Sequence, residues 1–524
     1  MLRAFWTYDP IPDRRDDDKW FFDKSVWQKM FRTMNTCQFN AMFFSAAEVF
    51  PCMIGLSVCP DDNLIDEAAA DGCQQMYHWI FQNALDYDIA PYLVLNPLRV
   101  PSDADPVEYI RHCMAALLDT YTELSGIILD GVGTPQNVKL IQQAVVDVLD
   151  AARPDAALII RAGGVDADFI TSSLTRRGNR KIGYCVKYTS DHLVDHNNDE
   201  AFARWVDAVD GENIIAEFGF ANFEPWTCFS FDTITNILSN LTEAGCLGLA
   251  PLPLSPGQWP HVSDSFFKYQ WQRDLIWYSA WGGMGIEQLK RQNRPKWLIR
   301  NFRLISGFEA ASRIIELLTL YFAGDRTSAW RPQYCSVETE RGPHLMSLSD
   351  MLQPGGLSEY SGRDWWEEIT GDPAIHLGEY ILKGAPENTY GPEEFIEELT
   401  DLAGLAVAAG EKGLRSASGE KELPSFSRDA LCMGKLGEFY VERIRGALSH
   451  AREENAEAAE HVARALGLYR ELVDIDSTHR EPFAPAWRQT TICGSWEPIL
   501  NVLEREYADV QKGVFKSGRD YPIN

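Results

Sequence analysis

Short apolar runs recur along the first half of the chain, and a helix-length segment separates each run from the next. The runs are rich in Ile, Val, Phe and Leu, which is typical of parallel strands buried on both faces. They lie at residues 5–9, 41–46, 90–97, 126–131, 157–164, 182–189, 214–220 and 246–254. Segments such as 106–124 and 137–155 carry helical sequences between them. Eight strand–helix units over about 250 residues predict a (β/α)8 TIM barrel.

The competing fold is a doubly wound open sheet. Such sheets that bind dinucleotides carry a G-x-G-x-x-G turn after the first strand. This chain has no such motif after residues 5–9. The barrel is therefore the preferred prediction.

The second half of the chain follows a helical pattern. One apolar stripe recurs every four residues, at Leu436, Tyr440, Ile444 and Leu448, and a second contains Ala458, Val462, Leu466, Tyr469 and Leu472. We predict a catalytic barrel over 1–285 and a mainly α-helical C-terminal domain over 286–524. An irregular arm around 325–391 is too long for a passive connection, and we predict that it covers a site or reaches a neighbouring subunit.

Composition and charge narrow the functional classes. The 524 residues exceed one ordinary core, which agrees with two domains. A net charge of -28 opposes binding to a phosphate backbone, so nucleic acid is not expected as a partner. No apolar run approaches the roughly 20 residues that cross a bilayer, and no membrane association is predicted. The 11 scattered cysteines and the lack of an export pattern in the first twenty residues favour a reducing, cytoplasmic location, unless a preceding segment has been removed.

Polar residues at the strand ends are the candidates for chemistry. The C-terminal ends of barrel strands face the active site, so a polar residue that closes an apolar run points toward substrate. The candidates, in chain order, are Asp9, Asp13, Glu48, Asn96, Asp130, Arg161, Lys187, Glu217 and Trp259. The alternative for each is a structural salt bridge at a loop edge. Buried ions cost several kcal/mol each, which is tolerated mainly where pairing or function compensates.

Asp130 and Glu217 form the clearest carboxylate pair. Glycoside hydrolysis uses two carboxyl groups, one to protonate the leaving oxygen and one as base or nucleophile. Glu217 lies between Ala216 and Phe218, and apolar surroundings favour the protonated form that a general acid needs. The alternative is that Glu217 bonds Arg161 or Lys187 as a structural or substrate-orienting partner.

Arg161 and Lys187 place two cations on neighbouring strands of an acidic protein. A guanidinium binds a carboxylate through two parallel hydrogen bonds, and an ammonium adds a point charge. This predicts a substrate with a carboxylate, although the two cations could equally serve to neutralise Asp130 and Glu217. Trp6, Trp226 and Trp259 could stack on a sugar ring or pack at the rim. No metal or organic cofactor is predicted, since the spaced pair His192 and His196 lacks a clear third ligand.

Several segments resemble a known family. The runs LIIRAGG, YCVKYTSDH, AEFGFANFEPW, PLPLSPGQWP and WQRDLIWYSAWGGMG resemble the later strands and following helix of bacterial α-glucuronidases. The opening RAFWTYD and the helical second half are similar to a wider group of exo-acting barrel glycosidases, which includes inverting sialidases with a strand-one aspartate.

The resemblance implies roles for particular residues. A base on the first strand would be Asp9 or Asp13. The histidine that the sialidases carry on strand four is missing, and Asp130 lies nearest to its place. Helical C-terminal regions support dimers in α-glucuronidases, so the resemblance implies a homodimer in which His344, Trp365 and Trp366 of the arm complete a neighbour's pocket.

Together these features predict an exo-acting glycoside hydrolase that removes a terminal sialic or uronic acid from a glycan, by an inverting mechanism as the resemblance implies. Glu217 or Asp130 is the predicted acid, and Asp13, Asp9 or Asp130 the predicted base. The predicted substrate contacts are Arg161, Lys187, Asn96, Glu48, Trp259 and His344. The alternatives are a non-catalytic carbohydrate-binding or scaffolding barrel, and a sugar-acid lyase or isomerase that uses Lys187 as base.

Overall fold

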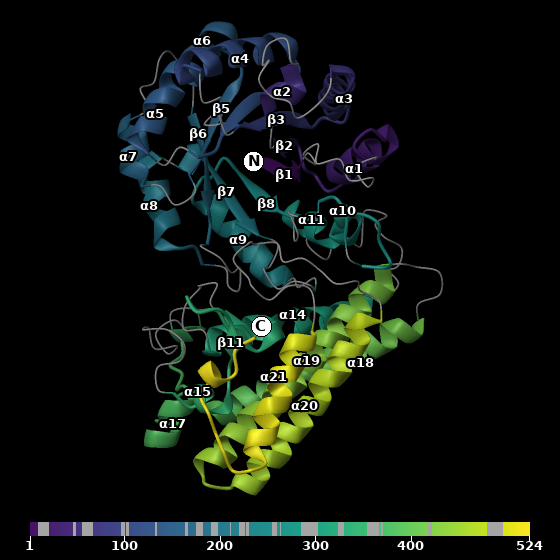
Figure 1. Cartoon of the computed structure of the whole chain (residues 1–524), viewed down its shortest axis with the longest axis vertical. Helices are drawn as coiled ribbons and strands as arrows, with labels where there is room; N and C mark the ends of the chain where they lie inside the picture. The colour runs from purple at the N-terminus through teal and green to yellow at the C-terminus, as the bar shows by residue number, and fades with distance from the viewer. Residues whose placement is uncertain are drawn as a thin grey trace.

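The structure of the chain is a computed structural model (Figure 1). It describes residues 1–8, 20–45, 49–54, 67–95, 100, 104–131, 134–162, 166–173, 182–189, 197–209, 211–219, 226, 230–253, 259–262, 264–283, 302–322, 330–353, 366–367, 370–416, 422–478 and 496–523.

Eight parallel strands close into a barrel, as the sequence pattern predicts. The strands are β1 (Leu2–Tyr8), β2 (Ala41–Ser45), β3 (Ala90–Leu95), β4 (Gly126–Leu129), β5 (Ala157–Arg161), β6 (Ile182–Lys187), β7 (Ile214–Gly219) and β8 (Gly248–Leu252). Each strand pairs with the next, and β8 closes the barrel on β1. The (β/α)8 fold is therefore confirmed, and every predicted strand is present.

The pleat of the strands divides their side chains between two cores. Alternate residues form a compact inner cluster, while the others pack outward under the helices. The inner cluster contains Ala4, Trp6, Ala41, Phe43, Val94, Ile128, Ile159, Cys185, Ile215, Ala250 and Leu252. Because side chains alternate with a period of two, Asp130, Arg161, Lys187 and Glu217 share the inward face with these residues. They lie one step closer to the carboxyl ends of β4 to β7.

Helices surround the barrel. Their bounds are α1 (Lys24–Thr36), α2 (Val49–Ile54), α3 (Glu67–Asp86), α4 (Pro106–Thr120), α5 (Pro135–Ile141), the π-helical turn η2 (Gln142–Val146), α6 (Asp147–Ala152), α7 (Ala167–Ser173), α8 (Glu200–Val209), η3 (Gly211–Asn213), α9 (Phe231–Glu243), α10 (Gln270–Arg273) and α11 (Leu275–Trp281). Helix α4 illustrates the local cause: Asp105 caps it by accepting from the Glu108 N–H, and Pro106 occupies its first turn. Its buried stripe then faces the strands.

The second half of the described chain is mainly helical. Its elements are α14 (Phe302–Phe322), α15 (Leu348–Met351), α17 (Leu377–Lys383), α18 (Pro392–Ser416), α19 (Glu422–Ala451), α20 (Asn455–Ser477), α21 (Glu497–Val510), the turns η5 (Pro332–Tyr334) and η6 (Gly518–Asp520), and a small sheet of β9 (Trp330–Arg331), β10 (Ser336–Val337) and β11 (His344–Leu345). Both predicted apolar stripes are buried, one in α19 and one in α20. The predicted boundary at residue 285 lies outside the described residues and stays a prediction.

Helices α18, α19 and α20 lie side by side in Figure 1. Glycines allow α18 and α19 to approach closely. A Cβ added at Gly413 would overlap the side chain of Ser427, and one added at Gly410 would crowd Leu431. These two positions therefore require glycine for the packing seen.

The predicted arm packs in part against its own chain. Trp366 is buried, stacks on Tyr390 with ring centroids 4.6 Å apart, and meets Tyr321 edge-on. The Trp366 side chain, as placed here, is therefore covered by its own chain and does not face a neighbouring subunit. Trp365 lies outside the described residues.

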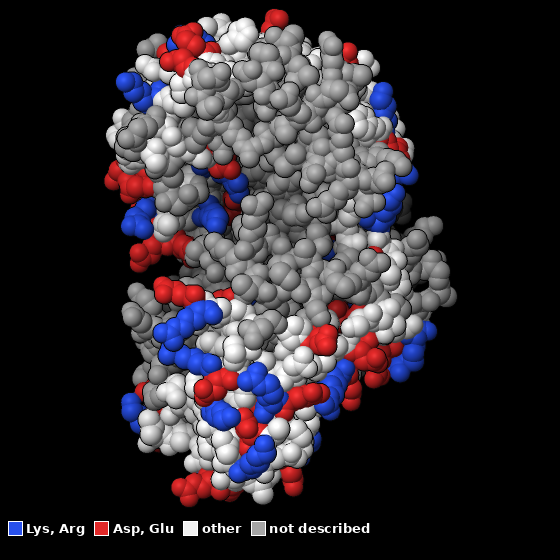
Figure 2. Space-filling model, in the orientation of Figure 1, with Lys and Arg blue, Asp and Glu red and all other residues white. Residues whose placement is uncertain are grey.

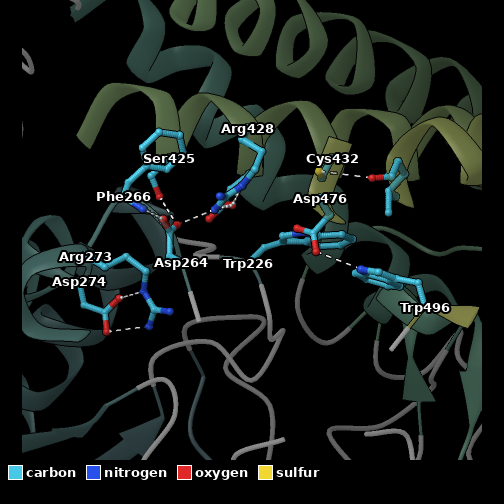
Figure 3. Close-up of polar contacts among 12 residues, drawn as sticks. Trp226, Asp264, Phe266, Arg273, Asp274, Ser425, Arg428, Cys432, Asp476 and Trp496 are labelled. Carbon is cyan, nitrogen blue, oxygen red and sulfur yellow. Dashed lines mark hydrogen bonds and ion pairs between the residues drawn. The ribbon is translucent and has the colours of Figure 1, made fainter. Parts of the chain in front are cut away.

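The helical half meets the barrel at the chain that follows β7 and β8. Trp226 comes after β7 and bonds Asp476 of α20, and Asp264 comes after β8 and bonds Arg428 of α19 (Figure 3). Thr233 of α9 also bonds Glu316 of α14. Segments that follow barrel strands lie at the carboxyl end of the barrel. The helical half therefore supports one side of the barrel mouth.

Membrane-spanning helices, cysteine pairing and surface charge are further features on which the sequence made predictions. Within the described residues, no helix is long and apolar enough to cross a membrane. The seven cysteines of the described ranges are free thiols. On the face drawn in Figure 2, Lys and Arg side chains of the helical half are interspersed with Asp and Glu.

Candidate active site

Arg161, at the end of β5, joins carboxylates from two other strands. Its Nε and Nη2 donate to the two carboxylate oxygens of Glu217 at 2.8 Å each, and its Nη1 donates to Oδ2 of Asp130 at 3.1 Å. We call Asp130, Arg161 and Glu217 the mouth triad. The sequence predicted that these three side chains converge, and the structure places them together.

The two carboxylates of the mouth triad differ in exposure. The Glu217 side chain is 2% exposed, whereas the Asp130 side chain is 37% exposed. Glu217 also lies 3.6 Å from the Cys185 thiol, which donates to its Oε2. Among the described residues, Asp130 accepts one further bond, from the N–H of its neighbour Gly131. Asp130 is thus the carboxylate that solvent or substrate reaches first.

Arg161 contacts an aromatic ring in addition to the two carboxylates. Its Cζ lies 4.8 Å from the ring centroid of Trp6, which belongs to the inner barrel core. Burial by itself lowers the pKa of Arg161, but the charges of Glu217 and Asp130 outweigh that effect and raise it. The guanidinium therefore stays charged, and its orientation is fixed by ion pairs and a cation–π contact.

Tyr8 stands beside the mouth triad at the end of β1. Its ring stacks on Trp6 at 6.2 Å and meets Trp259 edge-on at 6.5 Å. Burial raises the pKa of the Tyr8 phenol; the Arg161 charge opposes this shift, and the Glu217 and Asp130 charges add to it. The phenol therefore remains an O–H donor next to two carboxylates.

Tyr8 and Cys185 are the two site residues that sequence reasoning missed. Both look like core residues because each continues an apolar run. Strand parity was the available signal, since Tyr8 falls two residues beyond Trp6 and Cys185 two before Lys187, all on the inward face. Burial raises the pKa of the Cys185 thiol well above its ordinary value, and the Glu217 charge adds to the shift. The thiol is therefore a neutral donor to Glu217.

Lys187 is placed where the sequence predicted. It ends β6, its Cα pairs in register with that of Glu217, and its side chain is exposed. It brings a second cation to the mouth beside Arg161.

The remaining predicted contacts are less uniform. Trp259 is described, and its Nε1 donates to Thr7 Oγ1 at 3.1 Å, which places the indole next to Tyr8. Trp6 and Trp226 are fully buried, so both pack within the protein. Asp9, Asp13, Glu48 and Asn96 lie outside the described residues, as do His192 and His196.

His344 lies in the small three-stranded sheet, whereas the mouth triad lies in the barrel. It belongs to β11, where it pairs with Val337, and its Nδ1 contacts the Leu345 carbonyl at 3.0 Å. Within the described ranges no hydrogen bond or ion pair joins it to the mouth triad. The part of the chain that the structure describes also contains no group of three His, Cys, Asp or Glu side chains arranged for a metal ion.

Comparison with known proteins extends the fold assignment. No family model and no curated protein sequence matches the chain. Among solved structures, a GH138 enzyme targeting pectin rhamnogalacturonan II matches with a TM-score of 0.77 and 18% identity over 98% of this chain and 67% of that chain. CpGH84D matches with a TM-score of 0.41 and 10% identity over 97% of this chain and 75% of that one. A Thermobaculum terrenum O-GlcNAc hydrolase matches with a TM-score of 0.41 and 8% identity, over 98% and 96%.

The match to the GH138 enzyme covers both halves of this chain. At this level of identity it establishes a common fold, a (β/α)8 barrel followed by a helical second half. The other two matches, with TM-scores below 0.5, add nothing to that conclusion.

Proposed function

We propose that the protein is an exo-acting glycoside hydrolase that removes a terminal sialic or uronic acid from a glycan. The observation that supports it best is the mouth triad, in which carboxylates from β4 and β7 share one guanidinium at the carboxyl end of a (β/α)8 barrel. Two carboxyl groups on different strands are what glycoside hydrolysis requires. Since the similar GH138 enzyme is described as targeting pectin rhamnogalacturonan II, pectic oligosaccharides are the first substrates to test.

Exposure and hydrogen bonding suggest separate roles for the two carboxyl groups. Asp130 is open to solvent and accepts one bond from Arg161, so we assign it the exchange of a proton with the leaving oxygen. Glu217 accepts two bonds from Arg161, which favours its ionised form as the partner of the positive charge that develops on the sugar. For an inverting reaction the base is proposed to be Asp9 or Asp13.

The acidic character of the substrate rests on the cations at the mouth. Arginine has five N–H donors, and the described contacts of Arg161 use three of them. The remaining Arg161 donors can bind one substrate carboxylate at the end of β5, and the Lys187 ammonium at the end of β6 adds positive charge to the same side of the mouth. An acidic sugar would therefore be oriented beside Asp130.

Leaving-group dependence tests the proposed roles. We expect Asp130→Asn to lower kcat by about 10²–10⁴-fold on glucuronides or galacturonides with a natural sugar leaving group. The loss should be much smaller on aryl glycosides, whose leaving groups need no proton. Glu217→Gln should lose activity on both kinds of substrate. Proton NMR of the first product anomer reports whether the reaction is inverting.

The second candidate is a carbohydrate-binding or scaffolding barrel without turnover. It is favoured by the environment of Glu217, which is buried and whose carboxylate oxygens already accept hydrogen bonds from Arg161 and Cys185. Binding of acidic oligosaccharides with no turnover across the substrate panel would support it and exclude the hydrolase. A product mass without added water would instead indicate the lyase or isomerase alternative. The homodimer implied by the resemblance remains a proposal, and light scattering in solution tests it.

A further inference from the structure

Two tryptophans from distant parts of the chain share one buried carboxylate. The Trp226 Nε1–H donates to Asp476 Oδ1 at 3.1 Å, and the Trp496 Nε1–H donates to Asp476 Oδ2 at 3.0 Å. The two indole rings stack with centroids 5.6 Å apart and an interplanar angle of 21°. All three side chains are buried. Figure 3 shows the stacked rings beside Asp476.

The two bonds to Asp476 differ in what they connect. Asp476 lies at the end of α20, and Trp496 immediately precedes α21, so their bond is internal to the helical half. Trp226 follows the end of β7 and precedes α9, so its bond crosses to the barrel. The same carboxylate thus joins Trp496 of the helical half to Trp226, which lies on the chain that leaves the strand of Glu217.

The Trp226 contact fixes a point in the connection between β7 and α9. That connection begins after Gly219 and ends at Ser230, whose side chain caps α9 by accepting from the Thr233 N–H. Fixing Trp226 in one position costs conformational entropy. The buried indole and its bond to a carboxylate offset that loss.

A second anchor lies close to the first. Asp264, which follows β8, accepts bonds from Ser425 and Arg428 of α19, and Arg428 also feels the charge of Asp476. The segments that follow β7 and β8 are therefore attached to the same part of the helical half. Small displacements of a reacting group lower catalytic rates steeply, by about 10²-fold for 1 Å.

We propose that Asp476 is a positioning residue for the active site: through Trp226 it fixes the chain that leaves β7 and so maintains the placement of Glu217 in the mouth triad. This inference rests on the proposed function. It assigns to the helical half a direct part in the activity of the barrel.

The test removes one donor at a time, because Asp476→Ala would leave both indoles without an acceptor and endanger the fold. Trp226→Phe keeps an aromatic ring and removes the N–H that crosses to the barrel. Trp496→Phe is the matched control, since it removes the other N–H from the same carboxylate. Both variants should lower the Tm by similar amounts.

Activity should separate the two variants. We expect Trp226→Phe to lower kcat by about tenfold or more with little change in KM, because Glu217 is displaced while the cations that bind substrate remain. Trp496→Phe should stay within about twofold of the wild type. Equal activities in the two variants, whether both reduced or both unchanged, would overturn the inference.

Failure of the proposed function has a different signature. A wild-type protein that turns over no acidic glycoside fails that proposal by itself. Crystal structures of the two variants then report the placement of Glu217 directly, and a displaced Glu217 carboxylate, with longer Arg161–Glu217 distances, in Trp226→Phe alone supports the inference. The same Arg161–Glu217 geometry in both variants would overturn it.

Discussion

Two of the clusters in which one arginine pairs with two carboxylates differ in their access to water. In the mouth triad, the Arg161 and Asp130 side chains are 24% and 37% exposed. The second cluster, the interface triad, joins Arg428 of α19 to Asp264 at 2.6 Å and Asp429 at 2.9 Å. Its side chains are at most 1% exposed.

The aspartates of the two clusters differ in how much of their hydrogen-bonding capacity remains. Asp264 in the interface triad also accepts from the Ser425 hydroxyl and the Phe266 N–H, both at 2.7 Å (Figure 3). Asp130 in the mouth triad keeps lone pairs that face solvent. Buried charges are tolerated when their partners satisfy them, whereas a charge cluster with unused capacity at an opening can bind a ligand. We infer that the same chemistry is structural at the interface and functional at the mouth.

The largest expected effect comes from breaking the interface triad. Arg428→Met leaves Asp264 and Asp429 buried without their shared cation, and the free energy of unfolding should fall by about 3–5 kcal/mol. Urea denaturation measures this loss.

The matched control is Arg445→Met on the same helix. Arg445 makes a surface pair with Glu442 at 3.1 Å, and surface pairs contribute about 0–1 kcal/mol. A similar loss of stability in both variants would mean that the buried interface triad contributes no more to stability than a surface ion pair does.

The two triads also differ in how far the sequence predicts them. Asp130, Arg161 and Glu217 each close a strong apolar run, so strand parity and the common direction of parallel strands bring them to one rim. Asp264 and Arg428 come from two halves of the chain whose relative placement no local pattern encodes. The same reason hides the Trp226–Asp476 bond. Tyr8 and Cys185 were missed because an aromatic and a thiol inside an apolar run look like core.

The fold was more predictable than the site for a related physical reason. Strands covered on both faces produce continuous apolar runs, as at 126–129 and 214–219, and these remain visible without tertiary information. The exposure of Asp130 and the burial of Glu217 depend on neighbouring strands. Their opposite environments could not be predicted from two runs that look alike.

His376 is a buried basic side chain that, unlike Arg161 and Arg428, forms no ion pair within the described ranges, so it shows what burial does without a carboxylate partner. It precedes α17 and accepts from the Gly378 N–H through Nδ1. Burial lowers its pKa from 6.5 to about 4, against a smaller opposing effect of Glu379. The folded state therefore resists protonation more than the unfolded state does.

The sign of the pH effect follows from that shift. Between pH 6.5 and about 4 the unfolded chain binds more protons at this position, so stability is lost as pH falls through this window, by about 3 kcal/mol in total. His376→Asn keeps a cap acceptor and should flatten this part of the stability–pH curve. An unchanged slope in His376→Asn would contradict this prediction.

The smallest effect is expected for the stability of the mouth triad after loss of Asp130. Asp130→Asn removes one carboxylate from Arg161, but Arg161 keeps both bonds to Glu217 and gains access to water. The free energy of unfolding should therefore change by less than about 1 kcal/mol, even though kcat on natural glycosides falls steeply. The corresponding change in the interface triad is Asp264→Asn, which removes one carboxylate from Arg428. Urea denaturation of this variant beside Asp264→Asn measures the contrast directly. A loss of several kcal/mol at Asp130 would place the mouth triad with the interface triad as a structural cluster, and the functional distinction between them would fail.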